Sequence, residues 1–152
     1  EEWEVEDNAD LADGELVIPL GVAEVKREGT DVSLIAHGRA VLTCLKAAEI
    51  LEAEHGISVE VVDLRSIRPL DEDTIFESVR KTHKAICVDE NKPFGSVGSQ
   101  IAAMIQQHCF DELDAPVLRV NALDAPAFYS PPIEKIQLPY PDVVIAKVLS
   151  IC

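Results

Sequence analysis

Short runs of consecutive apolar residues alternate along the chain with longer segments whose apolar residues recur every three or four positions. The short runs predict buried strands, and the longer segments predict amphipathic helices. The expected strands cover residues 32–36, 57–64, 85–88 and 117–120. The expected helices cover residues 39–54, 71–81, 97–108 and 142–150. Strands and helices therefore alternate from residue 31 onward.

Residues that start and stop helices support these bounds. Asp71 can accept hydrogen bonds from the free backbone N–H groups of a first helical turn, and Leu70 can pack on Ile75 beside it. Gly56 provides a stop for the helix that begins after Gly38. These signals predict where the helix over residues 71–81 begins and where the helix over residues 39–54 ends.

Strands that are nearly all apolar and separated by helices are typical of a parallel sheet covered on both faces. The predicted fold class is therefore α/β: a three-layer, open, mostly parallel sheet with helices on both faces. The prolines between residues 126 and 141 are too closely set for a helix, so we expect this segment to run along the surface.

The chain has 152 residues, of which 47% are hydrophobic, and this is enough for one buried core. Its net charge of -15 argues against a nucleic-acid partner and favours a basic protein surface. Eight carboxylates and no Lys or Arg occur in residues 1–15. We therefore expect an acidic linker or arm over residues 1–17 and one domain over residues 18–152.

No apolar run approaches the length needed to cross a bilayer, and no signal peptide is recognisable, so we expect a soluble protein without a membrane partner. The expected location is the bacterial cytoplasm, with an organellar matrix as the alternative. The first residue is Glu rather than Met, which suggests a processed chain or a fragment.

The four cysteines show no CxxC or dense spacing. Cys44, Cys87 and Cys109 fall within apolar periodic segments, so we expect free buried thiols rather than disulfides. His108 and Cys109 are adjacent, and neighbouring helix positions point about 100° apart, so this pair does not predict a zinc site.

The loops that follow the strands hold the candidate chemical groups, because ligands of open parallel sheets bind at the carboxyl ends of the strands. His37 ends the first strand and is the best single acid/base candidate, with a structural role as the alternative. Asp89 and Glu90 follow the third strand. Adjacent strand residues face opposite sides, which favours helix capping or an interdomain contact over paired acid/base chemistry.

The turn over residues 94–99 contains two glycines and opens a helix. It lacks the lysine of a phosphate-binding loop and the GxGxxG spacing, so it predicts close backbone packing rather than a phosphate site. Ser96 and Ser99 do not form a GxSxG motif, and the only histidine downstream is His108 in the same helix. A hydrolase triad is therefore not predicted.

A set of segments in a fixed order resembles the C-terminal domain of transketolase-like proteins. The order of these segments is IPLG at 18–21, AEVKREGTD at 23–31, HGR at 37–39, VEVVDLR at 59–65, IRPLD at 67–71, VDE at 88–90, LDAPV at 113–117 and YSPP at 129–132. Within that superfamily, the chain is most similar to the β subunit of the E1 component of 2-oxoacid dehydrogenases, the pyruvate dehydrogenase type. C-terminal domains of transketolase or deoxyxylulose-phosphate synthase, and a stand-alone interaction domain without enzyme activity, remain the alternatives.

The resemblance implies an oxidoreductase that decarboxylates a 2-oxoacid and transfers the acyl group to a lipoyl group on E2. The full enzyme would use thiamine diphosphate and magnesium, held by a GDG motif and a following Asn on other domains. This chain has only the residues ADG at 12–14, within the acidic arm. We therefore expect no catalytic, cofactor or metal residues here, and an inactive domain when isolated.

The resemblance instead implies a role in assembly. The family forms an α2β2 heterotetramer in which this domain packs β against β, beside the E1 α subunit, and docks the basic subunit-binding domain of E2. The match carries the acidic docking contact onto Asp114 and onto the C-terminal carboxylate, here that of Cys152. Glu112 is added as a neighbouring candidate on charge alone.

Overall fold

The computed structural model describes residues 18–152 and contains one sheet of five strands flanked by helices. The strands are β1 (Glu24–Arg27), β2 (Val32–Ala36), β3 (Val59–Asp63), β4 (Ala85–Val88) and β5 (Leu118–Val120). The helices are α1 (Arg39–His55), α2 (Glu72–Thr82), α3 (Val97–His108), the short 3-10 helix η2 (Phe110–Glu112), α4 (Pro131–Gln137) and α5 (Pro141–Leu149). The predicted acidic linker over residues 1–17 lies outside the described residues.

The strand order is β1-β3-β2-β4-β5, with β2, β3, β4 and β5 parallel and β1 antiparallel to β3. The chain passes from β2 to β3 on one side and then to β4 on the other side of β2. The order therefore reverses between β2 and β4, and this is the topological switch point of the sheet.

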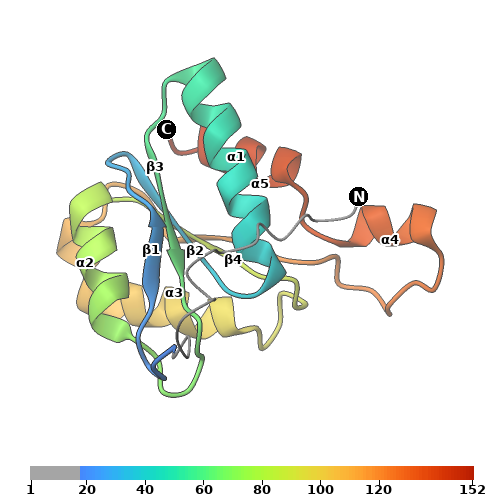
Figure 1. Ribbon diagram of the computed structural model, residues 1–152, viewed down its shortest axis with the longest axis horizontal. Coiled ribbons are helices and arrows are strands. Elements are labelled where there is room, and N and C mark those ends of the chain that lie inside the picture. The colour runs from blue at the N-terminus through green and yellow to red at the C-terminus, as the bar shows by residue number, and fades with distance from the viewer. Residues whose placement is uncertain (1–17) are drawn as a thin grey trace, which may run out of the picture.

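Helices cover both faces of the sheet, which confirms the predicted three-layer α/β class (Figure 1). Along β2, alternate residues face opposite sides: Val32, Leu34 and Ala36 pack in the core formed with α1 and α5, whereas Ile35 packs in the core formed with α2 and α3. All five residues of β2 are buried. Burial on both faces explains why four of its five residues are apolar, and the hydroxyl of the fifth, Ser33, contacts those of Ser78 and Thr82.

The caps anticipated from the sequence are present. The Asp71 carboxylate accepts a hydrogen bond from the Thr74 backbone N–H at 3.1 Å, and Leu70 packs in the same core cluster as Ile75. Gly56 has a positive φ of 67° at the end of α1, a conformation that glycine adopts without steric cost.

Two features differ from the sequence prediction. The segment rich in prolines contains α4, because Pro131 and Pro132 occupy its first positions, where a helix needs no backbone N–H donor. Strand β1 was not anticipated, since its residues are mostly charged and its apolar pattern is too short to recognise. As an edge strand it buries only part of its surface, and its sequence need not be apolar.

Among residues 18–152, no helix is both long enough and apolar enough to span a bilayer.

Candidate partner-docking site

The carboxyl edge of the sheet brings together several of the groups singled out in the sequence. The Arg39 guanidinium lies 3.1 Å from the Glu90 carboxylate, so the loops after β2 and β4 are joined across the switch point. His37 is half-buried, and its Nε2 has no hydrogen-bond partner among the described residues. No carboxylate among residues 18–152 hydrogen-bonds to this imidazole.

Asp89 is buried and serves the start of α3. Its carboxylate accepts hydrogen bonds from the backbone N–H groups of Asn91 at 3.0 Å and Gly98 at 2.9 Å, and from the Asn121 side-chain amide at 2.8 Å. A Cβ atom at Gly98 would lie 2.7 Å from the Asp89 Oδ2. Both the capping role of Asp89 and the close packing of this turn are thus confirmed.

The two serines of the same turn are also structural. The Ser96 hydroxyl accepts from the Ser99 backbone N–H at 3.2 Å, and the Ser99 hydroxyl donates to the Pro93 carbonyl at 3.0 Å. Neither hydroxyl contacts a histidine among the described residues: the Ser96 hydroxyl caps α3, and the Ser99 hydroxyl ties the helix start to the preceding loop.

The cysteines carry free thiols, and Cys44, Cys87 and Cys109 are buried as anticipated. Burial, and after it the nearby Asp89 carboxylate, raise the pKa of the Cys87 thiol to about 12. A thiol with so high a pKa remains protonated at neutral pH and is a poor nucleophile.

A depression of about 340 Å³ lies at the opposite, amino edge of the sheet. Its walls are formed by residues that precede the parallel strands β2, β3 and β4, by the loop that follows η2, and by the last residue of the chain. The lining residues are Thr30, Asp31, Ile57, Thr82, His83, Lys84, Asp114 and Cys152. Two of the three residues predicted for partner docking, Asp114 and Cys152, therefore lie in the same depression.

Backbone hydrogen bonds hold these two residues at the edge. The Asp114 N–H donates to the His83 carbonyl at 2.9 Å, which fixes the loop after η2 against the residues that lead into β4. The Cys152 N–H donates to the Val148 carbonyl at 3.0 Å, continuing the last turn of α5. The Lys84 Nζ lies 3.7 Å from the Cys152 Sγ.

Glu112, the third predicted residue, does not line the depression. Its carboxylate lies 3.5 Å from the Arg80 guanidinium on α2, and its carbonyl oxygen contacts the His83 Nδ1 at 2.8 Å. Glu112 thus joins η2 to the end of α2. The geometry brings Asp114 and Cys152 together but separates the Glu112 carboxylate from them.

Asp31 and Lys84 line the same depression and were not anticipated from the sequence. The Asp31 carboxylate accepts from the Ser58 backbone N–H at 2.7 Å, which ties together the turns before β2 and β3. Both residues immediately precede a parallel strand, so they must lie at one edge. Their position directly before a strand was a usable signal, although ligands of open parallel sheets usually bind at the other, carboxyl ends of the strands.

Comparison with known proteins places this geometry in a family. The model "Transketolase, C-terminal domain" matches residues 21–144. A solved structure titled "Split gene transketolase, inactive beta4 tetramer" superposes with a TM-score of 0.74 at 32% sequence identity, covering 88% of this chain and 42% of that chain.

Curated relatives are β subunits of larger enzymes. The chain is 47% identical over 134 residues to the acetoin:2,6-dichlorophenolindophenol oxidoreductase subunit beta of Bacillus subtilis, covering 88% of this chain and 39% of that protein. It is 44% identical over 122 residues to the mitochondrial pyruvate dehydrogenase E1 component subunit beta of Dictyostelium discoideum, covering 80% and 34%. It is 47% identical over 131 residues to the 2-oxoisovalerate dehydrogenase subunit beta of Bacillus subtilis, covering 86% and 40%. The chain thus spans 34–40% of the length of these three relatives.

Proposed function

The chain belongs to the transketolase C-terminal domain family, and on that premise we propose that it is the C-terminal domain of an E1 β subunit of the pyruvate dehydrogenase type. The full enzyme would be an oxidoreductase that decarboxylates a 2-oxoacid and transfers the acyl group to a lipoyl group of E2. Similarity to β subunits from pyruvate and 2-oxoisovalerate dehydrogenases supports this proposal. The same similarity makes the alternatives less favoured, namely that the domain comes from a transketolase or a deoxyxylulose-phosphate synthase, or is a stand-alone interaction domain.

The proposed role of this domain is to bind partners rather than to perform chemistry. The observation that carries it is that Asp114 and Cys152, which are distant in sequence, line one depression at the amino edge. Carboxylates at such a position can receive the arginines of a basic E2 subunit-binding domain in short, charge-assisted hydrogen bonds. The net charge of -15 would also attract a basic module at long range.

The described residues do not fit a thiamine diphosphate and magnesium site. The N-terminus of α3, which follows the glycine-containing turn, already holds the Asp89 carboxylate against the Gly98 N–H. A diphosphate placed there would meet that carboxylate and be repelled. Among residues 18–152, no three His, Cys, Asp or Glu side chains are grouped so that they could hold a metal ion. The proposed cofactor would therefore be held by other domains of the enzyme.

The docking proposal is tested by replacing Asp114 in the assembled E1 enzyme. Because truncating one partner of a desolvated charge pair leaves the other unpaired, Asp114→Ala should weaken E2 binding by on the order of 2 kcal/mol, about thirtyfold in Kd. The decrease of E2 affinity with added salt should also become shallower, since one charge is gone. Surface plasmon resonance with the isolated E2 subunit-binding domain across a salt series measures both effects.

Asp111→Ala is the matched control, because Asp111 is exposed on η2 and lies outside the depression. It should change E2 affinity by less than about twofold, the range of exposed rim charges. Decarboxylation measured without E2 should be the same for both variants and shows that E1 has assembled. Unchanged E2 affinity of Asp114→Ala across the salt series would remove Asp114 from the docking site.

A further inference from the structure

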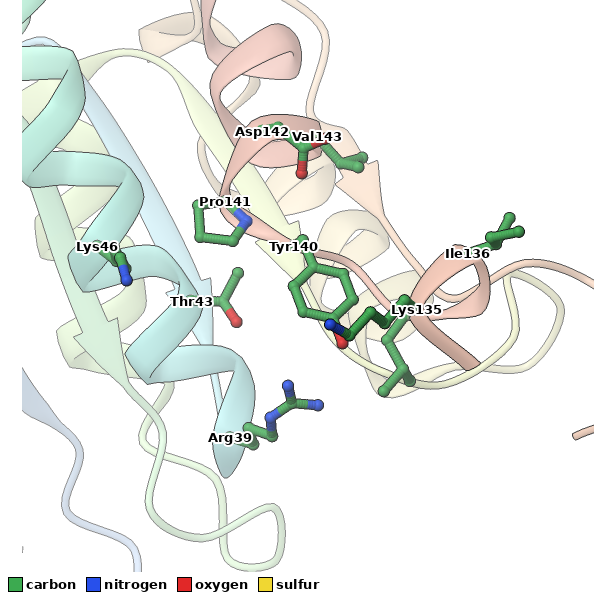
Figure 2. A pocket seen from close by; sticks show the side chains of 10 residues that line it. Arg39, Thr43, Lys46, Lys135, Ile136, Tyr140, Pro141, Asp142 and Val143 are labelled. Carbon is green, nitrogen blue, oxygen red and sulfur yellow. The ribbon is translucent and has the colours of Figure 1, made fainter. Parts of the chain in front are cut away.

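A second and larger depression, of about 610 Å³, lies between α1 and the junction of α4 with α5 (Figure 2). Arg39, Thr43 and Lys46 are spaced four and three residues apart, so they share one face of α1. Lys135 comes from α4, and Tyr140 immediately precedes α5. These side chains line a space formed by elements that are distant in sequence.

The lining is cationic in a protein that is otherwise strongly acidic. Three of the ten lining residues are basic, namely Arg39, Lys46 and Lys135, and one is acidic, Asp142. Asp142 lies in the first turn of α5, where a carboxylate stabilises the positive end of the helix dipole. The whole chain carries a net charge of -15, so three basic side chains around one depression contrast with the charge of the rest of the chain.

Arg39 is held in place on the wall of the depression. Its guanidinium carbon lies 5.7 Å from the centre of the Tyr140 ring, and one of its nitrogens contacts the Glu90 carboxylate. Contact with Tyr140, and then the charge of Glu90, raise the pKa of Arg39 above its ordinary value. A guanidinium has five N–H donors, and the contact with Glu90 occupies one nitrogen, so donors remain for a ligand.

The two lysines have no such structural partners. Lys46 and Lys135 are both exposed and form no ion pair among the described residues. Lysine ammonium groups on flexible stems can converge on an oxyanion as point charges, while an arginine supplies a directional fork. The combination is suited to several oxygen atoms of one compact anion.

One end of the depression, at Arg39, adjoins the place where this type of fold binds ligands. Arg39 begins α1 directly after the carboxyl end of β2, and its contact with Glu90 crosses the point where the strand order reverses. Open α/β sheets bind ligands next to this switch point. A volume of about 610 Å³ lies within the 300–1,000 Å³ that is usual for small-molecule sites.

We propose that this depression binds a small phosphorylated metabolite, with the phosphate group between Arg39, Lys46 and Lys135. Apolar lining residues on the other side, Ile136, Leu138 and Val143, would contact the organic part of that ligand. Thr43 and Tyr140 add hydroxyl groups that can donate to phosphate oxygens. The site is distinct from the docking depression, because the two share no lining residue.

The proposal is compatible with the expectation that this chain binds no thiamine diphosphate. In its magnesium complex, the diphosphate charge of that cofactor is largely neutralised by the metal and by the cationic thiazolium ring. The electrostatic attraction between three cationic side chains and such a nearly neutral complex would be weak. A free phosphate monoester retains its negative charge and would be attracted.

The test is titration of the 152-residue chain with phenyl phosphate at low ionic strength, in buffer without magnesium, by calorimetry and by NMR of backbone amides. We expect saturable binding at one site per chain, with the largest shifts in the first two turns of α1 and at Tyr140. Inorganic phosphate should bind at least threefold more weakly than phenyl phosphate, because it lacks a group to contact the apolar wall.

Lys46→Gln and Lys135→Gln should each weaken phenyl phosphate binding at least threefold, and the double variant at least tenfold. Both lysines are exposed, so neither substitution should affect folding. Lys147→Gln is the matched control, since it removes the same charge from α5 outside the depression. The absence of saturable binding, or an equal loss in Lys147→Gln, would overturn the proposal. Either failure would leave the Asp114 docking test unaffected.

Discussion

At the scale of single residues, the carboxyl edge shows how polar groups that resemble an active site are used for structure. Asp89, Gly98 and Asn121 form one unit around the buried Asp89 carboxylate, which satisfies two backbone donors and one amide. A buried carboxylate is stable only when it is paired or hydrogen-bonded in this way. The unit occupies the start of α3, the position at which helix N-termini in other proteins bind anions.

Gly98→Ala should destabilise the protein although alanine is the better helix former. The new Cβ would lie 2.7 Å from the Asp89 Oδ2 and 3.2 Å from the Cys87 Cβ, and Asp89 is held by hydrogen bonds. We expect a net loss of about 1–3 kcal/mol in the free energy of unfolding, measured with urea.

The reverse substitution at an exposed site on the same helix, Ala103→Gly, calibrates the helix preference and should cost about 1 kcal/mol. A gain of stability in Gly98→Ala would show that the turn can relax around a methyl group.

At the scale of elements, Asp71 joins an edge strand to a helix. Its carboxylate accepts from the Thr74 N–H at the start of α2 and, at 2.9 Å, from the Ala23 N–H next to β1. Burial by itself would raise the pKa of Asp71, but the hydrogen bonds from Ala23 and Thr74 outweigh it and hold the pKa below the ordinary 3.8. The charged form therefore stabilises the folded state.

Asp71→Ala should cost about 1–2 kcal/mol of stability at pH 7, because it removes the cap of α2 and leaves the Ala23 N–H next to β1 without its acceptor. A carboxyl group whose pKa is lower in the folded than in the unfolded protein stabilises the fold in full at pH values above its unfolded pKa. This stabilisation is lost as the pH falls through its folded pKa. The difference from the wild type should therefore narrow below pH 3.8. Urea unfolding at pH 7 and pH 3 measures this.

Asp73→Ala is the control, since Asp73 is exposed in the same first turn and interacts with the helix dipole without capping it. Its substitution should cost less than about 1 kcal/mol. Equal losses in the two variants would mean that Asp71 acts through charge alone.

At the scale of the whole molecule, the sheet separates two sites of opposite charge character. The amino edge presents Asp114 and Cys152 for proposed docking, whereas the carboxyl edge presents the cationic depression beside Arg39. Apart from that depression, the segment between residues 123 and 133 exposes four large apolar side chains. These are Leu123, Phe128, Tyr129 and Ile133. Such a surface is typical of a subunit contact, which accords with the proposed β–β assembly.

The isolated chain should bind no thiamine diphosphate. Calorimetric titration with the cofactor and excess magnesium should show no saturable heat, because the described residues provide no fitting site and the α3 N-terminus is occupied by Asp89. Full-length E1 under the same conditions is the positive control. Micromolar binding by the chain would contradict the assignment of the cofactor to other domains.

The isolated chain should also self-associate through its exposed apolar surface. Sedimentation velocity at increasing concentration should show dimers or larger species, and the double variant Tyr129→Asp with Ile133→Asp should shift the distribution towards monomer. Phe94→Asp is the control, because Phe94 is 95% exposed but lies outside that surface. A wild-type chain that stays monomeric, or an equal shift in Phe94→Asp, would remove this surface from the assembly.

The sequence by itself determined the features that depend on near neighbours. The alternation of β2, α1, β3, α2, β4 and α3, the Asp71 cap and the buried thiols all follow from apolar periods and local hydrogen bonding. The resemblance of ordered segments identified the family, and it predicted Asp114 as a docking contact. These signals act over a few residues or were already present as recognisable motifs.

Only the tertiary structure decided which distant residues meet. The pairing of charged β1 with β3, the contact of Arg39 with Glu90, and the shared depression of Lys84, Asp114 and Cys152 depend on strand order. Strand order is set by long-range backbone pairing and by packing on both faces of the sheet, and neither leaves a local pattern in the sequence. The two edges of the sheet acquire their different chemistry at this level.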